Sequence, residues 1–414
     1  RPPRSTLFPY TTLFRSHLLE WLNLVIRWVH VIVGIAWIGA SFYFVWLENN
    51  LDRQVKNQDL AGELWAIHGG GIYHLQKYKL APATMPKHLH WFKWEAYSSW
   101  ISGVLLLSVV YYLNAATYLI LPGSPVSPAA GVAIGLGSLI MGWYIYDLLC
   151  KSALRHQPLL LGVALMVFLV LVAWGFSQFM TGRAAYLHVG AVIGTMMVGN
   201  VFFIIMPAQR NLVGAIEAGT APDPALPKNG LLRSRHNNYL TLPVIFIMVS
   251  SHFPSTYGHE WNWVILLGLS LVSVAVRHYF NIRHNSQQFL WALPAAVLAL
   301  LVMAYVTVPQ LPGSSAAKPT EAAAVVEPVT AQQAHTIVAA HCVSCHSATP
   351  SHAAFSTAPG GLMFDSIDEI KRYKDRIYLQ SVASRIMPLG NSTGMTQDER
   401  DQLGRWIADG ANTQ

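Results

Sequence analysis

Cys342, Cys345 and His346 follow one another in the order C-x-x-C-H. In that arrangement two thiols bond covalently to the vinyl groups of a haem, and the adjacent imidazole ligates its iron. A thioredoxin-like cysteine pair or half of a zinc site needs no histidine directly after the second cysteine. The chain has only three cysteines, so no second C-x-x-C could complete a zinc site. The spacing therefore predicts one covalently bound haem c.

A haem held in this way takes a second axial ligand, and Met387 in the segment "SRIMPLGN" is predicted to supply it. Pro388 prevents a helix from continuing through this segment, which suits a ligand on irregular backbone. Met363 and Met395 are alternative ligands, and Met387 could instead only fill the core of the haem domain. A His/Met pair raises the reduction potential. This haem is therefore predicted to accept electrons rather than to activate oxygen.

His30 and His188 lie inside apolar runs, where ionisable residues are costly and often functional. They occur in the stretches "RWVHVIVGIAWIGASFYF" and "AYLHVGAVIGTMMVGNVFF", which share a His-Val pair, small residues and a Phe-rich end. A haem b held between the two histidines would give electrons a path to the C-terminal haem. Alternatively, each histidine is neutral and packs against a neighbouring helix. Both interpretations stay open.

Two further segments, "KWEAYSSWISG" and "RSRHNNYLTLPVIFIMVSSHFP", are richer in polar and aromatic residues than the ends of membrane helices need. Anchoring at the membrane interface explains the rings, but it explains Glu95, Asn237 and Asn238 less well. These segments therefore predict a binding site. Zinc between His88 and His90 lacks further ligands at metal spacing.

The elements that carry these residues are predicted to be membrane helices. Of the 414 residues, 53% are hydrophobic and only 11% are charged, whereas soluble domains carry about 25% charged residues. Eight apolar segments can each span about 30 Å of hydrocarbon. The predicted fold is all-α: a polytopic membrane bundle of about eight transmembrane helices plus a small class I-like cytochrome c domain. The segments are Trp21–Leu47, Ala96–Ile120, Ala129–Leu149, Pro158–Phe179, Ala184–Met206, Asn237–His252, Trp261–His278 and Phe289–Val308.

Four regions are expected along the chain. Residues 1–16 fit nothing downstream and are predicted to be an adapter-derived artefact. Residues 17–308 form the transmembrane domain. Residues 309–330, rich in Pro, Ala and Ser, form a flexible tether. Residues 331–414 form the cytochrome c domain, with a helix running into the haem motif and a last helix capped by Thr396 and Glu399.

The charge pattern orients this bundle. Lys and Arg residues gather in the loops on one side, whereas the loops on the other side carry only Arg183. By the positive-inside rule both chain termini face outward, which places the haem motif outside a bacterial inner membrane, in the periplasm. The chain has a net charge of +7, and its Lys and Arg residues lie mostly in short loops between apolar runs. No nucleic-acid-binding motif is present, and nucleic acid is not expected as a partner.

The chain resembles the membrane-bound bacterial urate oxidase (urate hydroxylase) family. The resemblance rests on "HVIVGIAWIGASFYF", "GGGIYHLQKY", "MPKHLHWFKWEAYSSWISG" and "SRHNNYLTLPVIFIMVSSHFP", and in the tail on "CVSCH" and "MPLGN". It implies a bundle of about eight helices fused to a C-terminal cytochrome c domain. It also implies oxidation of urate to 5-hydroxyisourate, with electrons leaving through the haem to a periplasmic cytochrome or terminal oxidase.

Urate is a planar monoanion with several N–H and C=O groups, so its site needs a cation, amide-type partners and an aromatic lid. Trp94, Arg235, Asn237 and Asn238 are the predicted substrate residues. Glu95 or His236 would accept a proton as electrons depart. Two other functions stay open: a non-catalytic membrane subunit that relays electrons from a quinol or partner enzyme to haem c, and a haem or metal transporter.

Overall fold

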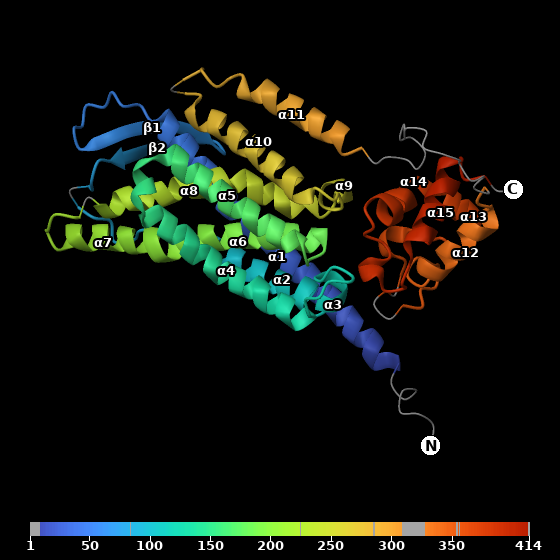
Figure 1. Cartoon of the computed structure of the whole chain (residues 1–414). Helices are drawn as coiled ribbons and strands as arrows, with labels where there is room; N and C mark the ends of the chain where they lie inside the picture. Colours follow the sequence, from blue (N-terminus) through green and yellow to red (C-terminus); the bar gives the residue numbers. More distant parts are fainter. Residues whose placement is uncertain are drawn as a thin grey trace.

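The structure is a computed structural model that describes residues 9–308 and 328–412, apart from positions 83, 224, 285, 353, 354 and 356. Long helices lie side by side over residues 9–306, and the C-terminal helices form a separate body at one end of them (Figure 1). A small β-hairpin and α7 lie at the opposite end. These are called the tail end and the hairpin end below. Most of the predicted tether, residues 309–327, lies outside the described residues.

Each predicted apolar segment coincides with helix. Five described helical stretches are long and apolar enough to cross a membrane: 17–50, 128–151, 158–177, 182–217 and 262–282. The other three segments differ because α2 breaks at a π-helical turn, α8 carries several polar residues, and α11 is short. The bundle helices are α1 (Pro9–Asn50), α2 (Trp94–Leu107), η2 (Ser108–Tyr112), α3 (Ala115–Tyr118), α4 (Pro128–Lys151), η3 (Ala153–His156), α5 (Pro158–Ser177), α6 (Gly182–Gly199), η4 (Asn200–Ile205), α7 (Met206–Glu217), α8 (Ala225–Ser250), α9 (Pro254–Tyr257), α10 (Asn262–Ile282) and α11 (Ala292–Val306).

The all-α prediction missed one element. Strands β1 (Leu60–His68) and β2 (Gly71–Tyr78) pair antiparallel in the segment between α1 and α2. Gly69 and Gly70 form the two-residue connection with φ of +57° and +80°. Two positive φ values define the turn whose twist matches a hairpin, and glycine adopts them without strain.

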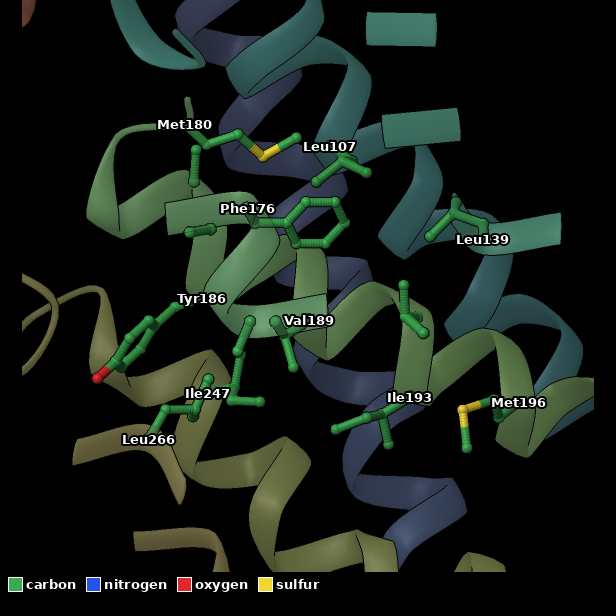
Figure 2. Packing of buried hydrophobic residues seen from close by; sticks show 14 of the residues in the cluster. Leu107, Leu139, Phe176, Met180, Tyr186, Val189, Ile193, Met196, Ile247 and Leu266 are labelled. Carbon is green, nitrogen blue, oxygen red and sulfur yellow. The ribbon is translucent and has the colours of Figure 1, made fainter. Parts of the chain in front are cut away.

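The core of the bundle is built around α6. This helix packs on α2, α4, α5 and α8. It begins the stretch 182–217, whose most apolar part is more than half buried, the largest share among the five stretches. Figure 2 shows Val189, Ile193 and Met196 of α6 among residues of the surrounding helices. Gly142 of α4 allows close approach, because a Cβ there would lie 2.7 Å from Val192 of α6. Many large apolar side chains on the other helices remain exposed, as expected of surfaces that face lipid.

The tail has a core of its own. Its elements are α12 (Ala331–His341), η5 (Pro359–Gly361), α13 (Ile367–Arg372), α14 (Lys374–Ile377), η6 (Tyr378–Ala383), η7 (Leu389–Asn391) and α15 (Gln397–Ala408). Trp406 and Leu403 of α15 are fully buried beside Val338 of α12. The predicted helix before Cys342 and the predicted cap of the last helix are both confirmed.

Glu399 illustrates how this cap is held. Its carboxylate accepts hydrogen bonds from the backbone N–H of Thr396 and from its hydroxyl, and it pairs with His341 at 3.1 Å. The backbone bond from Thr396, followed by the bond with His341, holds the pKa of Glu399 at about 2, below its ordinary value of 4.5. The carboxylate therefore ties the start of α15 to the end of α12.

Candidate functional site

The C-x-x-C-H segment forms a tight turn directly after α12. The backbone N–H groups of Cys345 and His346 both donate to the carbonyl of Cys342, at 3.1 and 2.8 Å. His346 Nδ1 lies 3.0 Å from the carbonyl oxygen of Leu362. As the donor in that bond, Nδ1 fixes the ring and leaves Nε2 as the ligating nitrogen, which is how proteins orient metal-bound histidines. Burial lowers the pKa of His346 and so favours the neutral, ligating form.

The alternatives for this motif fit less well. Burial raises the pKa of the Cys342 thiol to about 12, with the neighbouring Cys345 adding to the effect. Redox-active cysteine pairs work through a lowered thiol pKa. Within the described ranges, no cluster of three or more His, Cys, Asp or Glu side chains is arranged to hold a metal ion. The residues present therefore suit covalent haem better than a thioredoxin-like pair or zinc.

Met387 lies on irregular backbone that is held firmly in place. Its N–H donates to the carbonyl of Gln380 at 2.8 Å, and its carbonyl accepts from Arg400 Nη1 at 2.7 Å. Arg400 also bonds to Ser381 and Asn391 and is itself buried. The alternative ligands have other surroundings, since Met395 belongs to the tail core and Met363 is exposed. The axial role of Met387 stays a prediction, and its backbone is fixed as such a role requires.

The segment that carries Met387 also docks the tail on the bundle. Ile386 packs against the core cluster of the bundle, η6 contacts α9, and η7 contacts α3. A Cβ on Gly258 would lie 2.5 Å from Cβ of Ser384, and one on Gly390 would lie 2.9 Å from the carbonyl oxygen of Thr117. These approaches leave little room. The side of the tail that carries the predicted iron ligand therefore touches the bundle directly.

The two histidines inside the bundle are engaged with neighbouring helices. His30 Nδ1 lies 2.9 Å from Ser102 Oγ and 3.1 Å from the carbonyl of Ser99, both on α2. His188 is fully buried. Its Nδ1 bonds to the carbonyl of Ala184 at 2.8 Å, and its Nε2 bonds to the hydroxyl of Tyr112 at 3.1 Å. Both nitrogens of His188 are thus in use. The arrangement fits helix packing better than the predicted haem b.

The predicted substrate residues do not form one group. Trp94 is 65% exposed at the start of α2, and Arg235 is exposed on α8. Glu95 lies 3.7 Å from His90, and its Oε2 is buried without a partner in the described structure. Asn237 and Asn238 are both buried, but they join two different clusters on α8.

The first cluster is the Asp147–Arg233 network, a buried set of polar side chains between α4, η4 and α8. Arg233 is fully buried, donates from Nη2 to Asp147 at 2.5 Å, and donates from Nη1 to Asn200 at 3.3 Å. Asn200 donates to Tyr146 Oη and to Asn237 Oδ1, both at 2.8 Å. The hydroxyl of Tyr146 lies 2.9 Å from Nδ1 of the predicted base, His236. Arg233, two residues before the predicted Arg235, is therefore the buried arginine here.

The second cluster joins α8 to α10. Asn238 Oδ1 accepts from Arg277 Nε at 3.1 Å and from Asn281 Nδ2 at 2.7 Å. Arg277 lies over the ring of Phe42 on α1, with its guanidinium carbon 3.9 Å from the ring centroid. Sequence reasoning missed Arg277 and Asn281. The signal for Arg277 was present, because an arginine inside an apolar run marks a functional position in a membrane helix.

Fold and site together define a polytopic helix bundle of the kind that crosses membranes, with buried polar clusters and a C-terminal body that carries C-x-x-C-H. A family model described as "Urate oxidase N-terminal" matches residues 16–308. The chain belongs to this family, and the match covers the bundle from residue 16 onward. No curated protein and no solved structure gives a significant match.

Proposed function

We propose that the chain is a membrane-bound oxidoreductase that oxidises urate to 5-hydroxyisourate and delivers the electrons through haem c in its own tail. Membership of the urate oxidase family supports the substrate. The observation that carries the electron route is the docking of the C-x-x-C-H tail on that same family domain, through the segment that holds Met387. The electrons then pass to a periplasmic cytochrome or terminal oxidase.

The reaction has a defined balance. Urate and water give 5-hydroxyisourate, two protons and two electrons. Haem c, when bound, supplies a one-electron acceptor with the raised potential of His/Met ligation, so it must be reduced and reoxidised twice for each urate that is oxidised. The chain itself has to bind the urate anion and accept a proton from a ring N–H.

Glu95 is the better of the two predicted bases. Its Oε2 is buried and has no partner in the described structure, so it is an available proton acceptor. His236 is already engaged, because its Nδ1 lies 2.9 Å from the hydroxyl of Tyr146, which in turn accepts from Asn200. We therefore give the base role to Glu95 and a supporting role within the Asp147–Arg233 network to His236.

The proposed location is the bacterial inner membrane, with the tail in the periplasm. Its basis is the eight predicted apolar segments, five of which form helices long and apolar enough to cross a membrane, together with the distribution of basic residues among the loops. Protease added to spheroplasts should cleave the tail from outside, whereas inside-out vesicles should protect it. The reverse pattern would contradict this orientation.

An anaerobic titration tests the function. The purified, oxidised full-length protein receives urate without oxygen, and the haem absorption bands are followed. Reduction by urate supports a urate-oxidising enzyme with an internal electron route, and Glu95→Gln should slow it at least tenfold. If dithionite reduces the haem and urate does not, the chain is the electron-relay subunit rather than the enzyme. Without any haem bands, the role of C-x-x-C-H is refuted.

A further inference from the structure

The cluster of Asn238, Arg277 and Asn281 differs from the other polar groups of the bundle in its charge. Arg277 is 6% exposed and Asn238 is 4% exposed. Arg233 has the carboxylate of Asp147 beside it. By contrast, no carboxylate lies within ion-pair distance of Arg277 in the described part of the chain. A buried cation without a counter-ion is unfavourable, so this position calls for an anion from outside the chain.

The hydrogen bonds inside the cluster leave a defined set of atoms free. Asn238 Oδ1 accepts from both Arg277 Nε and Asn281 Nδ2. This double contact fixes which end of the Asn238 amide carries the donors. Arg277 Nη2, Asn238 Nδ2 and Asn281 Oδ1 are then buried without a partner among the described residues. Two donor groups and one acceptor group, all from three adjoining side chains, are thus left unsatisfied. Buried polar groups are nearly always paired.

The cluster also has an aromatic wall and a rigid frame. The guanidinium of Arg277 stacks on Phe42 at 3.9 Å, which holds its plane in place. The side chain of Asn49 on α1 donates to the carbonyl of Asn281 at 3.1 Å. Helix α1 is therefore tied to α10 at this end of the bundle, and the free donor and acceptor groups are held by side chains from three helices.

The depth of the cluster suits a ligand that arrives from water. Arg277 lies five residues before the end of α10 at Ile282. At 1.5 Å per residue that is about 8 Å from the helix end. The cluster therefore lies near the hairpin end of α10 rather than at the apolar centre of the bundle.

We propose that Arg277, Asn238 and Asn281 bind an anionic, planar heterocycle that carries C=O and N–H groups along one edge. Arg277 Nη2 and Asn238 Nδ2 donate to its carbonyl or anionic ring nitrogen, and Asn281 Oδ1 accepts from its ring N–H. The identification of this ligand as the urate monoanion rests on the function proposed above. The site itself rests on the orphaned atoms and the uncompensated charge.

Binding is measured on the oxidised full-length protein, without oxygen or an added electron acceptor, by equilibrium dialysis of labelled urate. Arg277→Gln removes the charge and keeps an amide, and Asn281→Asp places a second anion beside the site. Each should weaken urate binding roughly ten- to hundredfold. Arg283→Gln is the matched control. Arg283 also lies over a ring, Phe280, at the same helix end, and its loss should change affinity less than about twofold.

The melting temperature, measured with and without urate, distinguishes a variant that has lost the ligand from one that no longer folds properly. Bound urate should raise the melting temperature of the wild type and of Arg283→Gln, because a ligand of the native state stabilises it. Arg277→Met should melt at or above the temperature of the urate-free wild type, since it removes a buried uncompensated charge, and it should show no response to urate. A melting temperature well below that of the wild type would mean that Arg277 is structural, which overturns the proposal.

The outcomes separate this proposal from the proposed function. Urate binding that depends on Arg277 supports the site, even if urate fails to reduce the haem and the oxidase function falls. If Arg277→Gln needs the same urate concentration as the wild type for haem reduction, the site is overturned and the function is left intact. Equal affinity for a neutral purine overturns the anionic class. Absence of urate binding by the wild type overturns the site.

Discussion

The ion pair between Asp147 and Arg233 should be among the most sensitive points of the bundle. The side chain of Arg233 is 0% exposed and that of Asp147 is 13% exposed. Asp147→Asn keeps the shape of the side chain but leaves the arginine as an uncompensated buried charge. We expect it to lower the free energy of unfolding by about 3–5 kcal/mol. Lys151→Ala removes the other partner of Asp147, which is 60% exposed, and should cost at most about 1 kcal/mol.

A double variant distinguishes a lost attraction from a stranded charge. Asp147→Asn combined with Arg233→Met removes the charge as well as its partner, so most of the stability should return. Unfolding of the full chain in mixed micelles, with increasing denaturing detergent, is followed by helical circular dichroism. A cost below about 1 kcal/mol for Asp147→Asn, or an additive double variant, would refute the reasoning that this pair neutralises a fully desolvated arginine.

The tail offers three further tests. Because the pKa of Glu399 is lowered from 4.5 to about 2, its carboxylate stabilises the tail fully above pH 4.5 and progressively less as pH falls toward 2. In Glu399→Gln the stability of the tail should depend less on pH over this range, and the pH dependence of pepsin cleavage measures it. Gly390→Ala should slow urate-driven haem reduction severalfold by disturbing the docked segment, whereas Gly394→Ala, which has a similar positive φ and no neighbour within 4 Å, should not. Met387→His should lower the haem reduction potential in a redox titration, while Met395→Leu, in the tail core, should leave it near the wild-type value.

The bundle helices could be predicted from the sequence because long apolar runs have few alternatives in a membrane. The hairpin was missed for the opposite reason: Leu60–Tyr78 mixes polar and apolar residues without a long run. Its turn, however, gives a local signal. Adjacent glycines between two short alternating segments are typical of a two-residue hairpin connection.

The predicted substrate residues lie apart in the structure, because a sequence does not show which face of a helix is buried. Arg235 was predicted as the cation that a urate anion needs, yet Arg233 is the buried residue. Helical spacing could have corrected this choice, since Arg233 stands four residues before Asn237 and therefore on the same face. In the second cluster, Arg277 and Asn281 stand four residues apart and so share a face of α10, but spacing along one segment could not have revealed their contact with Asn238 of α8.

Helix α10 connects the end of the bundle on which the tail docks with the buried cluster around Arg277. Its first turn adjoins α9, which touches the docked tail, and Arg277 lies fifteen residues further along, about 22 Å away at 1.5 Å per residue. If the tail lies outside and a substrate is oxidised at Arg277, as proposed above, each electron travels outward through most of the bilayer. A full crossing of a membrane that is negative inside favours an electron by about 2.3 kcal/mol for each 100 mV, so a path of roughly three quarters of the hydrocarbon thickness gives about 1.7 kcal/mol. Oxidation at this site would thus be driven partly by the membrane potential, and the outward movement of electrons would dissipate that potential rather than build it up.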